Sequence, residues 1–474
     1  MTSRQGSGKK RRTRRPGRVV AIVAIVGAAP LASLWFVGHS LATRTKGRVA
    51  PASSAVSTPV LSVRRAAATL VTDVTIRNLR NELSGLVSKL PDASCLRVDA
   101  NGSTAVARQS DKSLIPASNT KILTAAVVLD AFAPDTRFIT KAVGEVVNGT
   151  IAGDLVLVGG GDPLLVTKDF LPSEKYPTTT PTYLDDLADR IKAAGITSIG
   201  GSVVGDESFL DDTRYNADWS SGVRAAEAGP LGALMVNDGV VVGDPLKPDN
   251  PAVGAAREFT RLLRARGITV SGEARSGSAG PTTSEIARIE SAVIDKVVAE
   301  MLTNSDNNTA EILVRQLGLA KSLQPTTSAG LKVIVETLKK WGIEGLKLRD
   351  GSGLSRNNRI SCNAIVAVLD RQPVNGNLVE GLSIAAKTGT LADAFKGSAV
   401  AGKLHGKTGT LLNVKTLSGV LPIGTNGGVT FALFLNGAGW ADQGNYRPLW
   451  DALGTAIATY PQGPTKSQVG VIGG

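Results

Sequence analysis

Two side chains near the start of an expected helix are suited to acyl-transfer chemistry. Ser118 and Lys121 lie three residues apart, so the lysine can reach the serine hydroxyl on the same helix face. A lysine that is shielded from water loses its charge readily and can act as a general base. A serine on the first helical turn also places developing oxyanion charge beside free backbone N–H groups. The spacing predicts a serine nucleophile with a lysine base; a capping serine with an exposed lysine is the alternative.

A second polar segment, Ser305-Asp306-Asn307, falls in a short break between two expected helices. The Ser305 hydroxyl could relay a proton to a leaving amine. The Asn307 amide could hold a substrate carbonyl or orient the lysine. For this segment taken alone, a polar turn that caps the next helix is the alternative.

A third segment, Lys407-Thr408-Gly409, opens an expected strand. An ammonium group and a hydroxyl suit a substrate carboxylate, and glycine lets a substrate lie close along the strand edge. The backbone N–H of Thr410 would complete an oxyanion hole with that of Ser118. An ordinary solvent-facing strand start is the alternative.

The sequence Lys-Thr-Gly-Thr-Leu occurs twice, at Lys387–Leu391 and at Lys407–Leu411. We assign the site to the second copy, because it leads into an alternating run, Thr408–Val420, that we expect to form an antiparallel hairpin with a partner strand at Val429–Asn436. The first copy is followed by a loop or short helix, which predicts a solvated Lys387.

The order Ser-x-x-Lys, Ser-Asp-Asn, Lys-Thr-Gly is the signature of serine β-lactamases and penicillin-binding proteins. Over roughly residues 80–460 the chain resembles the low-molecular-mass class C penicillin-binding proteins, the D-alanyl-D-alanine carboxypeptidase/endopeptidase family. The segments that carry this resemblance are Pro116–Lys121, Gly160–Pro163, Asp350–Arg356 and Lys407–Leu411.

The resemblance implies a serine-type D-alanyl-D-alanine carboxypeptidase, with D,D-endopeptidase activity left open. It would act on peptidoglycan stem peptides through an acyl-enzyme on Ser118, and β-lactams would inhibit it. The implied roles are Ser118 as nucleophile, Lys121 as base, Ser305 and Asn307 as the second motif, and Lys407 with Thr408 as the carboxylate site. For the family's diaminopimelate pocket, Trp219 with Asp218 is a weak candidate.

Two other functions stay open on the sequence. A β-lactamase-like hydrolase would need efficient deacylation, and the 187 residues between Ser118 and Ser305 argue against it. A non-catalytic penicillin-sensing or wall-binding protein would keep the same motifs as a receptor. With only two histidines in the chain, a Ser-His-Asp triad is close to excluded, and no metal or organic cofactor is expected.

We expect an α/β (α+β) fold: a transpeptidase-like antiparallel sheet with helices, and an α/β domain inserted between the first and second motifs. A repeated pattern supports the insertion: one expected helix stops at Gly195 and another at Gly267, and each is followed by a short expected strand. The expected divisions are a basic tail at 1–18, a transmembrane anchor or signal peptide at 19–42, a flexible stem at 43–75, the first part of the transpeptidase-like domain at 76–144, the inserted domain at 145–280 and the second part at 281–474.

The formal net charge of +13 is concentrated at the N-terminus. Eight Lys and Arg fall within the first 18 residues, and without them the rest of the chain carries +5. The uncharged run that follows predicts attachment to the membrane, with the catalytic body on the extracytoplasmic side, or secretion if the run is cleaved. Aromatic residues make up only 4%, which argues against a nucleic-acid partner. The two cysteines, Cys95 and Cys362, could pair in an exported protein.

Overall fold

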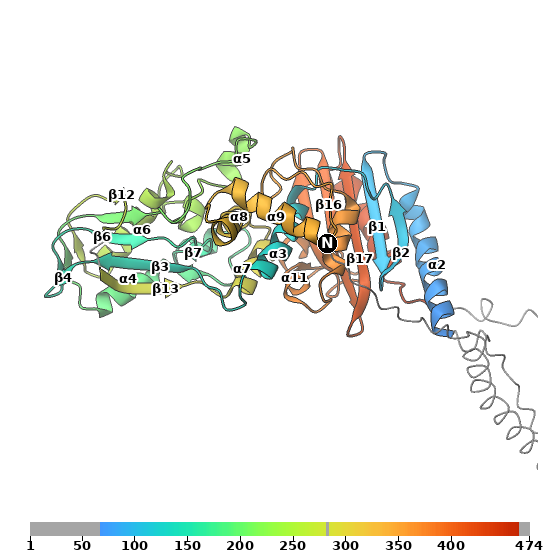
Figure 1. Ribbon diagram of the computed structural model, residues 1–474, viewed down its shortest axis with the longest axis horizontal. Helices are drawn as coiled ribbons and strands as arrows, with labels where there is room; N and C mark the ends of the chain where they lie inside the picture. Colours follow the sequence, from blue (N-terminus) through green and yellow to red (C-terminus); the bar gives the residue numbers. More distant parts are fainter. Residues whose placement is uncertain (1–66, 281–283, 464–474) are drawn as a thin grey trace, which may run out of the picture. The chain divides into compact units, whose positions relative to one another are not determined.

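An antiparallel sheet of six strands carries the third motif. The computed structural model describes residues 67–280 and 284–463; the expected basic tail and apolar segment lie outside the described residues. Every neighbouring pair of strands in this sheet is antiparallel. In spatial order the strands are β14 (Ser383–Ile384), β15 (His405–Leu411), β16 (Val414–Ile423), β17 (Gly427–Asn436), β1 (Ser94–Ala100) and β2 (Ser103–Arg108) (Figure 1).

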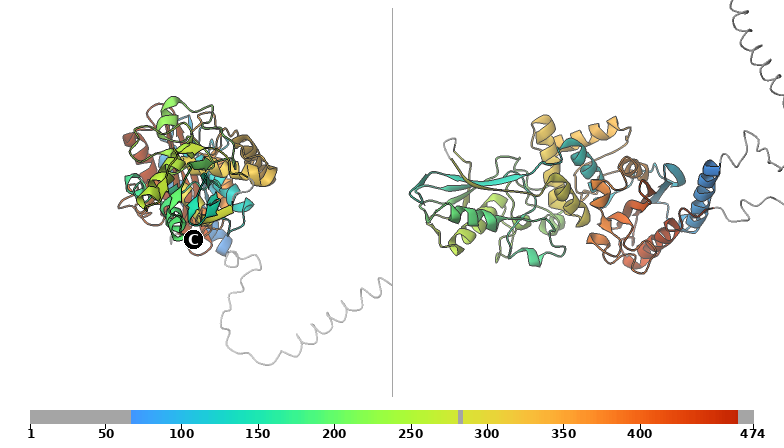
Figure 2. Two further views of the ribbon diagram at one scale, coloured as in Figure 1. Left: turned by 90° about the vertical axis from the view of Figure 1, so that its left-hand side faces the viewer. Right: turned by 90° about the horizontal axis from the view of Figure 1, so that it is seen from below.

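Helices cover both faces of this sheet, because successive side chains of its strands point to opposite faces. Along β17, Phe431 and Leu433 pack into one apolar cluster, and Ala432 and Phe434 pack into the other. The first cluster includes α2 (Ala67–Val87) and α12 (Gln443–Ile457), which lie close together in Figure 2. The second cluster is formed by the helices that carry the first two motifs and their neighbours: α3 (Thr120–Ala131), α7 (Ile294–Thr303), α8 (Asn307–Ser322), α9 (Thr327–Lys340), α10 (Cys362–Asp370) and α11 (Asn377–Glu380).

Helix α2 begins earlier than the expected start of folded material. Residues 67–75, which the sequence assigned to a flexible stem, are helical. Further along the helix, Leu79, Leu83 and Leu86 recur at helical spacing and are buried against the sheet, so packing stabilises the whole helix. No helix within the two described ranges is long and apolar enough to cross a bilayer.

A second group of strands lies between the first and second motifs. Its larger sheet has the order β12 (Arg275–Ser276), β10 (Val203–Asp206), β6 (Leu155–Val158), β3 (Ile139–Gly144) and β13 (Ser284–Glu290), and its smaller one has β11 (Thr269–Val270), β9 (Ser198–Ile199), β5 (Thr150–Ile151) and β4 (Val146–Val147). Helices α4 (Leu184–Ala193) and α6 (Pro251–Ala265) pack against these strands (Figure 1). The remaining elements are β7 (Leu165–Val166), β8 (Thr182–Tyr183), α5 (Ser221–Ala226) and the 3-10 turns η2 (Leu171–Ser173) and η3 (Asn237–Gly239).

The repeated helix–strand pattern seen in the sequence is a structural repeat. Helix α4 leads into β9 and then β10, and α6 leads into β11 and then β12. The first strands of the two units pair in parallel, and so do the second strands. Gly195 and Gly267 end the two helices with positive φ angles of 83° and 73°, which glycine adopts without strain.

Two strands of the larger sheet lie outside the expected limits of the insertion. β3 and β13 pair antiparallel with each other, and β3 pairs with β6. The range 145–280 therefore leaves out the first and the last strand of the inserted domain. We infer that the inserted domain extends from about 139 to about 290, because strands that share ladder hydrogen bonds belong to one sheet.

The prediction of a single run from Thr408 to Val420 is wrong. The run turns back at Leu412-Asn413, where Asn413 has a φ of 62°, and forms the hairpin β15–β16 with Leu411 opposite Val414. The partner of β15 is therefore β16, and β17 pairs with β16 instead. A two-residue turn leaves the apolar–polar alternation almost unbroken, so the pattern did not reveal it.

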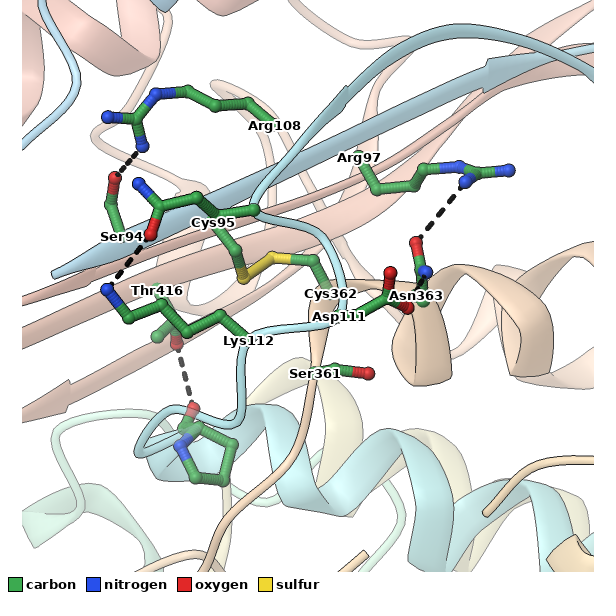
Figure 3. The surroundings of a disulfide bond; sticks show 12 residues. Ser94, Cys95, Arg97, Arg108, Asp111, Lys112, Ser361, Cys362, Asn363 and Thr416 are labelled. Carbon is green, nitrogen blue, oxygen red and sulfur yellow. Dashed lines mark hydrogen bonds between the residues drawn. A yellow bond between two sulfur atoms is a disulfide. The ribbon is translucent and has the colours of Figure 1, made fainter. Parts of the chain in front are cut away.

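A disulfide joins the sheet to the helical layer. Cys95 on β1 is bonded to Cys362 at the first turn of α10, and both side chains are fully buried (Figure 3). The bond links positions 267 residues apart in the sequence. It links the first strand of the transpeptidase-like domain to the part of that domain that follows the insertion.

Candidate active site

Ser118 lies in a tight turn that leads into α3. The turn η1 spans Ala117–Asn119, and Ala117 has a left-handed φ of 46°. Lys121 follows in the first turn of α3, and its Nζ lies 3.1 Å from Ser118 Oγ. The expectation that the two residues share one face is met. The hydroxyl of Ser118 contacts the Lys121 amine and not a helix N–H group, and Asn119 at the N-cap position of α3 makes no side-chain capping hydrogen bond.

The amine of Lys121 is fully buried among oxygen acceptors. Besides Ser118, it contacts Asn307 Oδ1 and the carbonyl oxygen of Ser352, each at 2.7 Å. Burial lowers the pKa of Lys121 to about 8, although four nearby carboxylates act in the opposite direction. A lysine with a pKa near 8 is far easier to deprotonate than a lysine in water. The carboxylates are those of Asp306, Asp350, Glu311 and Glu227.

The second motif is both a helix cap and part of the site. Asp306 is the N-cap of α8, where its Oδ1 accepts a hydrogen bond from the Thr309 N–H at 3.1 Å. Burial, together with Asp238, raises the pKa of Asp306 to about 7. The cap frees its two neighbours for other contacts: Asn307 reaches Lys121, and Ser305, with a φ of 64°, reaches the third motif. The capping turn and the functional motif are therefore the same structure.

Lys407 on β15 joins the second motif to the third. Its side chain is fully buried, and its Nζ donates to Ser305 Oγ at 2.8 Å and to the carbonyl oxygen of Thr408 at 3.0 Å. Burial lowers the pKa of Lys407 well below its usual value, and the positive charges of Lys121 and Lys415 lower it further. Lys407 thus lies behind Ser305, while the side chain of Thr408 faces the cavity described next.

These residues surround a cavity of about 720 Å³. Ser118 lines it together with Ser305, Asn307, Thr408 and Thr410, so all three motifs meet at one space. The edge of β15 beside Thr408–Thr410 is open within the described residues, because β14 pairs only with His405 and Gly406. An extended peptide can therefore pass along this edge toward Ser118.

The first copy of Lys-Thr-Gly-Thr-Leu also contributes to the site. Lys387 is exposed, but the turn η4 (Gly389–Leu391) brings Thr390 to the cavity wall, where its Oγ1 lies 2.9 Å from Thr408 Oγ1. Gly389 makes this approach possible, since a Cβ there would lie 2.1 Å from the carbonyl oxygen of Thr303. The duplication was the signal for Thr390, and it was interpreted only as a choice between two lysines.

The sequence assigned no role to two other residues near Lys121. The carbonyl of Ser352 is a backbone group, which no residue type announces. Glu311 lies in the middle of α8 and contacts the Ser352 segment.

Trp219, the weak candidate for the diaminopimelate pocket, is buried and donates to Asp350, and Asp218 accepts from Ser355; neither lines the cavity. Within 67–280 and 284–463 no three metal-binding side chains gather as a metal site would require.

A cavity-lining serine beside a buried lysine, under an antiparallel sheet with an open strand edge, defines an acyl-transferring serine enzyme of the penicillin-binding and β-lactamase-like class. The chain belongs to the D-Ala-D-Ala carboxypeptidase 3 (S13) family, which matches residues 93–248 and 244–456. It is a serine-type D-alanyl-D-alanine carboxypeptidase, and the predicted family, fold class and enzyme type are confirmed.

Several relatives span most of the chain. A D-alanyl-D-alanine carboxypeptidase of Actinomadura sp. (strain R39) is 27% identical, covering 71% of this chain and 76% of the relative. A carboxypeptidase of Mycobacterium tuberculosis is 28% identical, covering 87% of each. Penicillin-binding protein 4 of Haemophilus influenzae has the same fold, with a TM-score of 0.65, 21% identity and coverage of 79% of this chain and 97% of that one. Its complex with a β-lactam gives a TM-score of 0.58 and 22% identity, covering 78% and 98%.

Proposed function

We propose that Ser118 attacks the carbonyl of the penultimate D-Ala in a peptidoglycan stem peptide, with Lys121 as the general base. One observation carries this proposal. A neutral lysine amine has two N–H donors and one lone pair. Asn307 Oδ1 and the Ser352 carbonyl are acceptors and take both N–H groups, which leaves the lone pair for the Ser118 hydroxyl. The amine is thus aimed to receive the serine proton.

In the acylation step, the Ser118 Oγ bonds to the carbonyl carbon as its proton passes to Lys121. The backbone N–H groups of Ser118 and Thr410 would stabilise the oxyanion. The carbon–nitrogen bond to the terminal D-Ala then breaks, and the leaving amine takes a proton through the Ser305 hydroxyl. Lys407, which donates to Ser305 Oγ, keeps that hydroxyl oriented as a donor toward the amine.

The terminal carboxylate of the substrate would bind next to β15. Thr408 and Thr390 place adjacent hydroxyls on the cavity wall, and the buried ammonium of Lys407 supplies positive charge from behind. The prediction that Lys407 and Thr408 hold this carboxylate stays a prediction, with Lys407 acting at longer range than expected. Water then hydrolyses the ester, which releases the shortened peptide and restores the Ser118 hydroxyl.

β-Lactams would acylate the same serine, because their strained amide presents a carbonyl and a carboxylate in a similar arrangement. The β-lactam complex of the Haemophilus influenzae protein supports this by shared fold alone.

We also place the catalytic body on the extracytoplasmic side of the membrane. The basic residues before the apolar run at 19–42 support this orientation.

The test uses the full extracytoplasmic chain with a pentapeptide ending in D-Ala-D-Ala and, separately, with labelled benzylpenicillin. We expect loss of one D-Ala by mass analysis, and a penicilloyl adduct that maps to Ser118. Ser118→Ala should show neither while keeping its thermal transition, because the Ser118 hydroxyl contacts the Lys121 amine and not a helix N–H group. An adduct confined to another serine would overturn the assignment. An adduct on Ser118 without any D-Ala release would instead favour a penicillin-sensing protein.

A further inference from the structure

The segment Asp350–Arg356 carried part of the family resemblance but had no assigned role. It is packed between the nucleophile turn and α8. A Cβ on Gly353 would lie 1.9 Å from the carbonyl oxygen of Ala117, and one on Gly351 would lie 2.3 Å from Val314 on α8. Thr124 on α3 donates to the carbonyl oxygen of Gly351 at 3.0 Å. The segment therefore forms the side of the lysine site that the three motifs leave open.

Two buried carboxylates hold this segment in place. Asp350 accepts from the N–H groups of Gly353 and Ser355 and from the indole of Trp219. Glu311 holds the other end: its Oε1 accepts from the Ser352 N–H at 2.7 Å and from the Gly351 N–H at 3.0 Å. The carbonyl of Ser352 accepts from Lys121.

Glu311 lies one helical turn beyond Asn307 on α8. This helix therefore supplies both acceptors of the lysine, directly through Asn307 and indirectly through Glu311 and Ser352. If Ser352 moved, Lys121 would lose one acceptor, and the amine would rotate about its terminal bond. The lone pair would then no longer be confined to the direction of Ser118.

We propose that Glu311 is a positioning residue for Lys121: by anchoring the backbone at Gly351 and Ser352, it fixes the carbonyl that orients the amine toward Ser118. This inference rests on the proposed role of Lys121 as the base. Glu311 is 1% exposed and would touch no part of the substrate.

The charge of Glu311 gives the inference a second readout. Burial and the charge of Asp350 together raise the pKa of Glu311 to about 7, although the hydrogen bonds at Ser352 and the charge of Arg315 lower it. When ionised, Glu311 favours the charged form of Lys121, as do Asp306, Asp350 and Glu227. Lys407 is also close enough for like-charge repulsion, since the charge of Lys121 lowers the pKa of Lys407. Removing the charge of Glu311 should therefore lower the pKa of Lys121.

The experiment compares Glu311→Ala and Glu311→Gln with the wild-type chain. The Gln side chain keeps an oxygen that can accept from the two N–H groups, but it carries no charge, whereas Ala removes both. Glu258→Gln is the matched control: Glu258 is equally buried, on α6 of the inserted domain, and accepts from the Val242 N–H at 2.7 Å. For each protein, the acylation rate with benzylpenicillin is measured over a range of pH, and amide hydrogen exchange is measured for residues 349–356.

We expect Glu311→Ala to lose protection at residues 349–356 and to acylate about ten- to a hundredfold more slowly, as for other misplaced catalytic groups. Glu311→Gln should keep the protection and the plateau rate, with the acid limb of its pH profile moved to lower pH. Glu258→Gln should match the wild type.

Two results would overturn the inference. One is a wild-type rate and profile for Glu311→Ala. The other is an equal loss of rate in Glu311→Gln with residues 349–356 still protected, which would assign the effect to charge and not to position. A wild-type chain that benzylpenicillin does not acylate would instead count against the proposed function, a result that is distinct from both of these.

Discussion

Thr408 donates a hydrogen bond from its Oγ1 to Thr390 Oγ1 across 2.9 Å, and the two residues come from two copies of Lys-Thr-Gly-Thr-Leu, in which Thr408 is the second residue of one copy and Thr390 the fourth residue of the other. The copies play different roles. The second contributes a buried lysine and a strand edge, whereas the first contributes a hydroxyl from a short turn and leaves Lys387 exposed. The duplication is thus neither a spare site nor wholly incidental.

Only one of the two lysines of these copies should be sensitive to substitution. Lys407→Ala removes the ammonium that contacts Ser305, and a lost charge-assisted contact costs about 1.5–3 kcal/mol. We expect kcat/KM for D-Ala release to fall by about one to two decades. Lys387→Ala serves as the control and should stay near wild type. The reverse pattern would move the substrate carboxylate site to the first copy.

Thr390 should affect substrate binding more than chemistry. Thr390→Val keeps the shape of the side chain but removes the hydroxyl that accepts from Thr408. A neutral hydrogen bond is worth about 0.5–1.5 kcal/mol, so KM for the pentapeptide should rise about two- to tenfold. Thr390→Ser keeps the hydroxyl and should restore the wild-type value. An unchanged KM in Thr390→Val would exclude a role in holding the carboxylate.

The acylation rate should follow the protonation of Lys121. Only the neutral amine can accept the serine proton, and burial lowers the pKa of Lys121 to about 8. The rate with benzylpenicillin should therefore rise with pH and level off above about pH 8. Lys121→Arg, which keeps the charge but cannot deprotonate, should be inactive at every pH. A profile that is flat through this range would contradict Lys121 as the base.

The disulfide should contribute substantially to stability, because it closes a loop of 267 residues. The double variant Cys95→Ala, Cys362→Ala should unfold with a free energy lower by about 2–5 kcal/mol, measured by denaturant titration. The same protein with native cysteines, unfolded without reductant, should bind no alkylating reagent. Modification of both cysteines under those conditions would show that the bond does not form in the purified protein.

The orientation of the chain can be tested with a reporter fused after Gly474. A reporter that works only in the cytoplasm should be inactive, because the basic residues before the apolar run at 19–42 hold that end inside. Activity of this reporter would contradict the extracytoplasmic placement. Sequencing of the mature N-terminus decides a separate point: a start near Thr43 would replace the expected anchor with a cleaved signal peptide.

Local patterns were sufficient for several features of the site. The spacing of Ser118 and Lys121 places them together, because residues three apart share a helix face whatever surrounds the helix. The repeated helix–strand units after Gly195 and Gly267 were visible because a helix stop and a strand start are encoded by neighbouring residues. The order of the three motifs was enough to name the enzyme class.

Other features depended on contacts between distant segments. The turn at Leu412-Asn413 interrupts the alternating pattern too little to be seen, and the limits of the inserted domain depend on β3 pairing with β13. Lys121 and Ser352 are 231 residues apart, and the acceptor is a backbone carbonyl that any residue type could offer. Side-chain periodicity reports which face of an element is buried, but not which element covers it. Local spacing thus placed the proposed nucleophile beside its proposed base, and only the packing of α8 and the Asp350–Arg356 segment around them decided which acceptors surround the lysine amine.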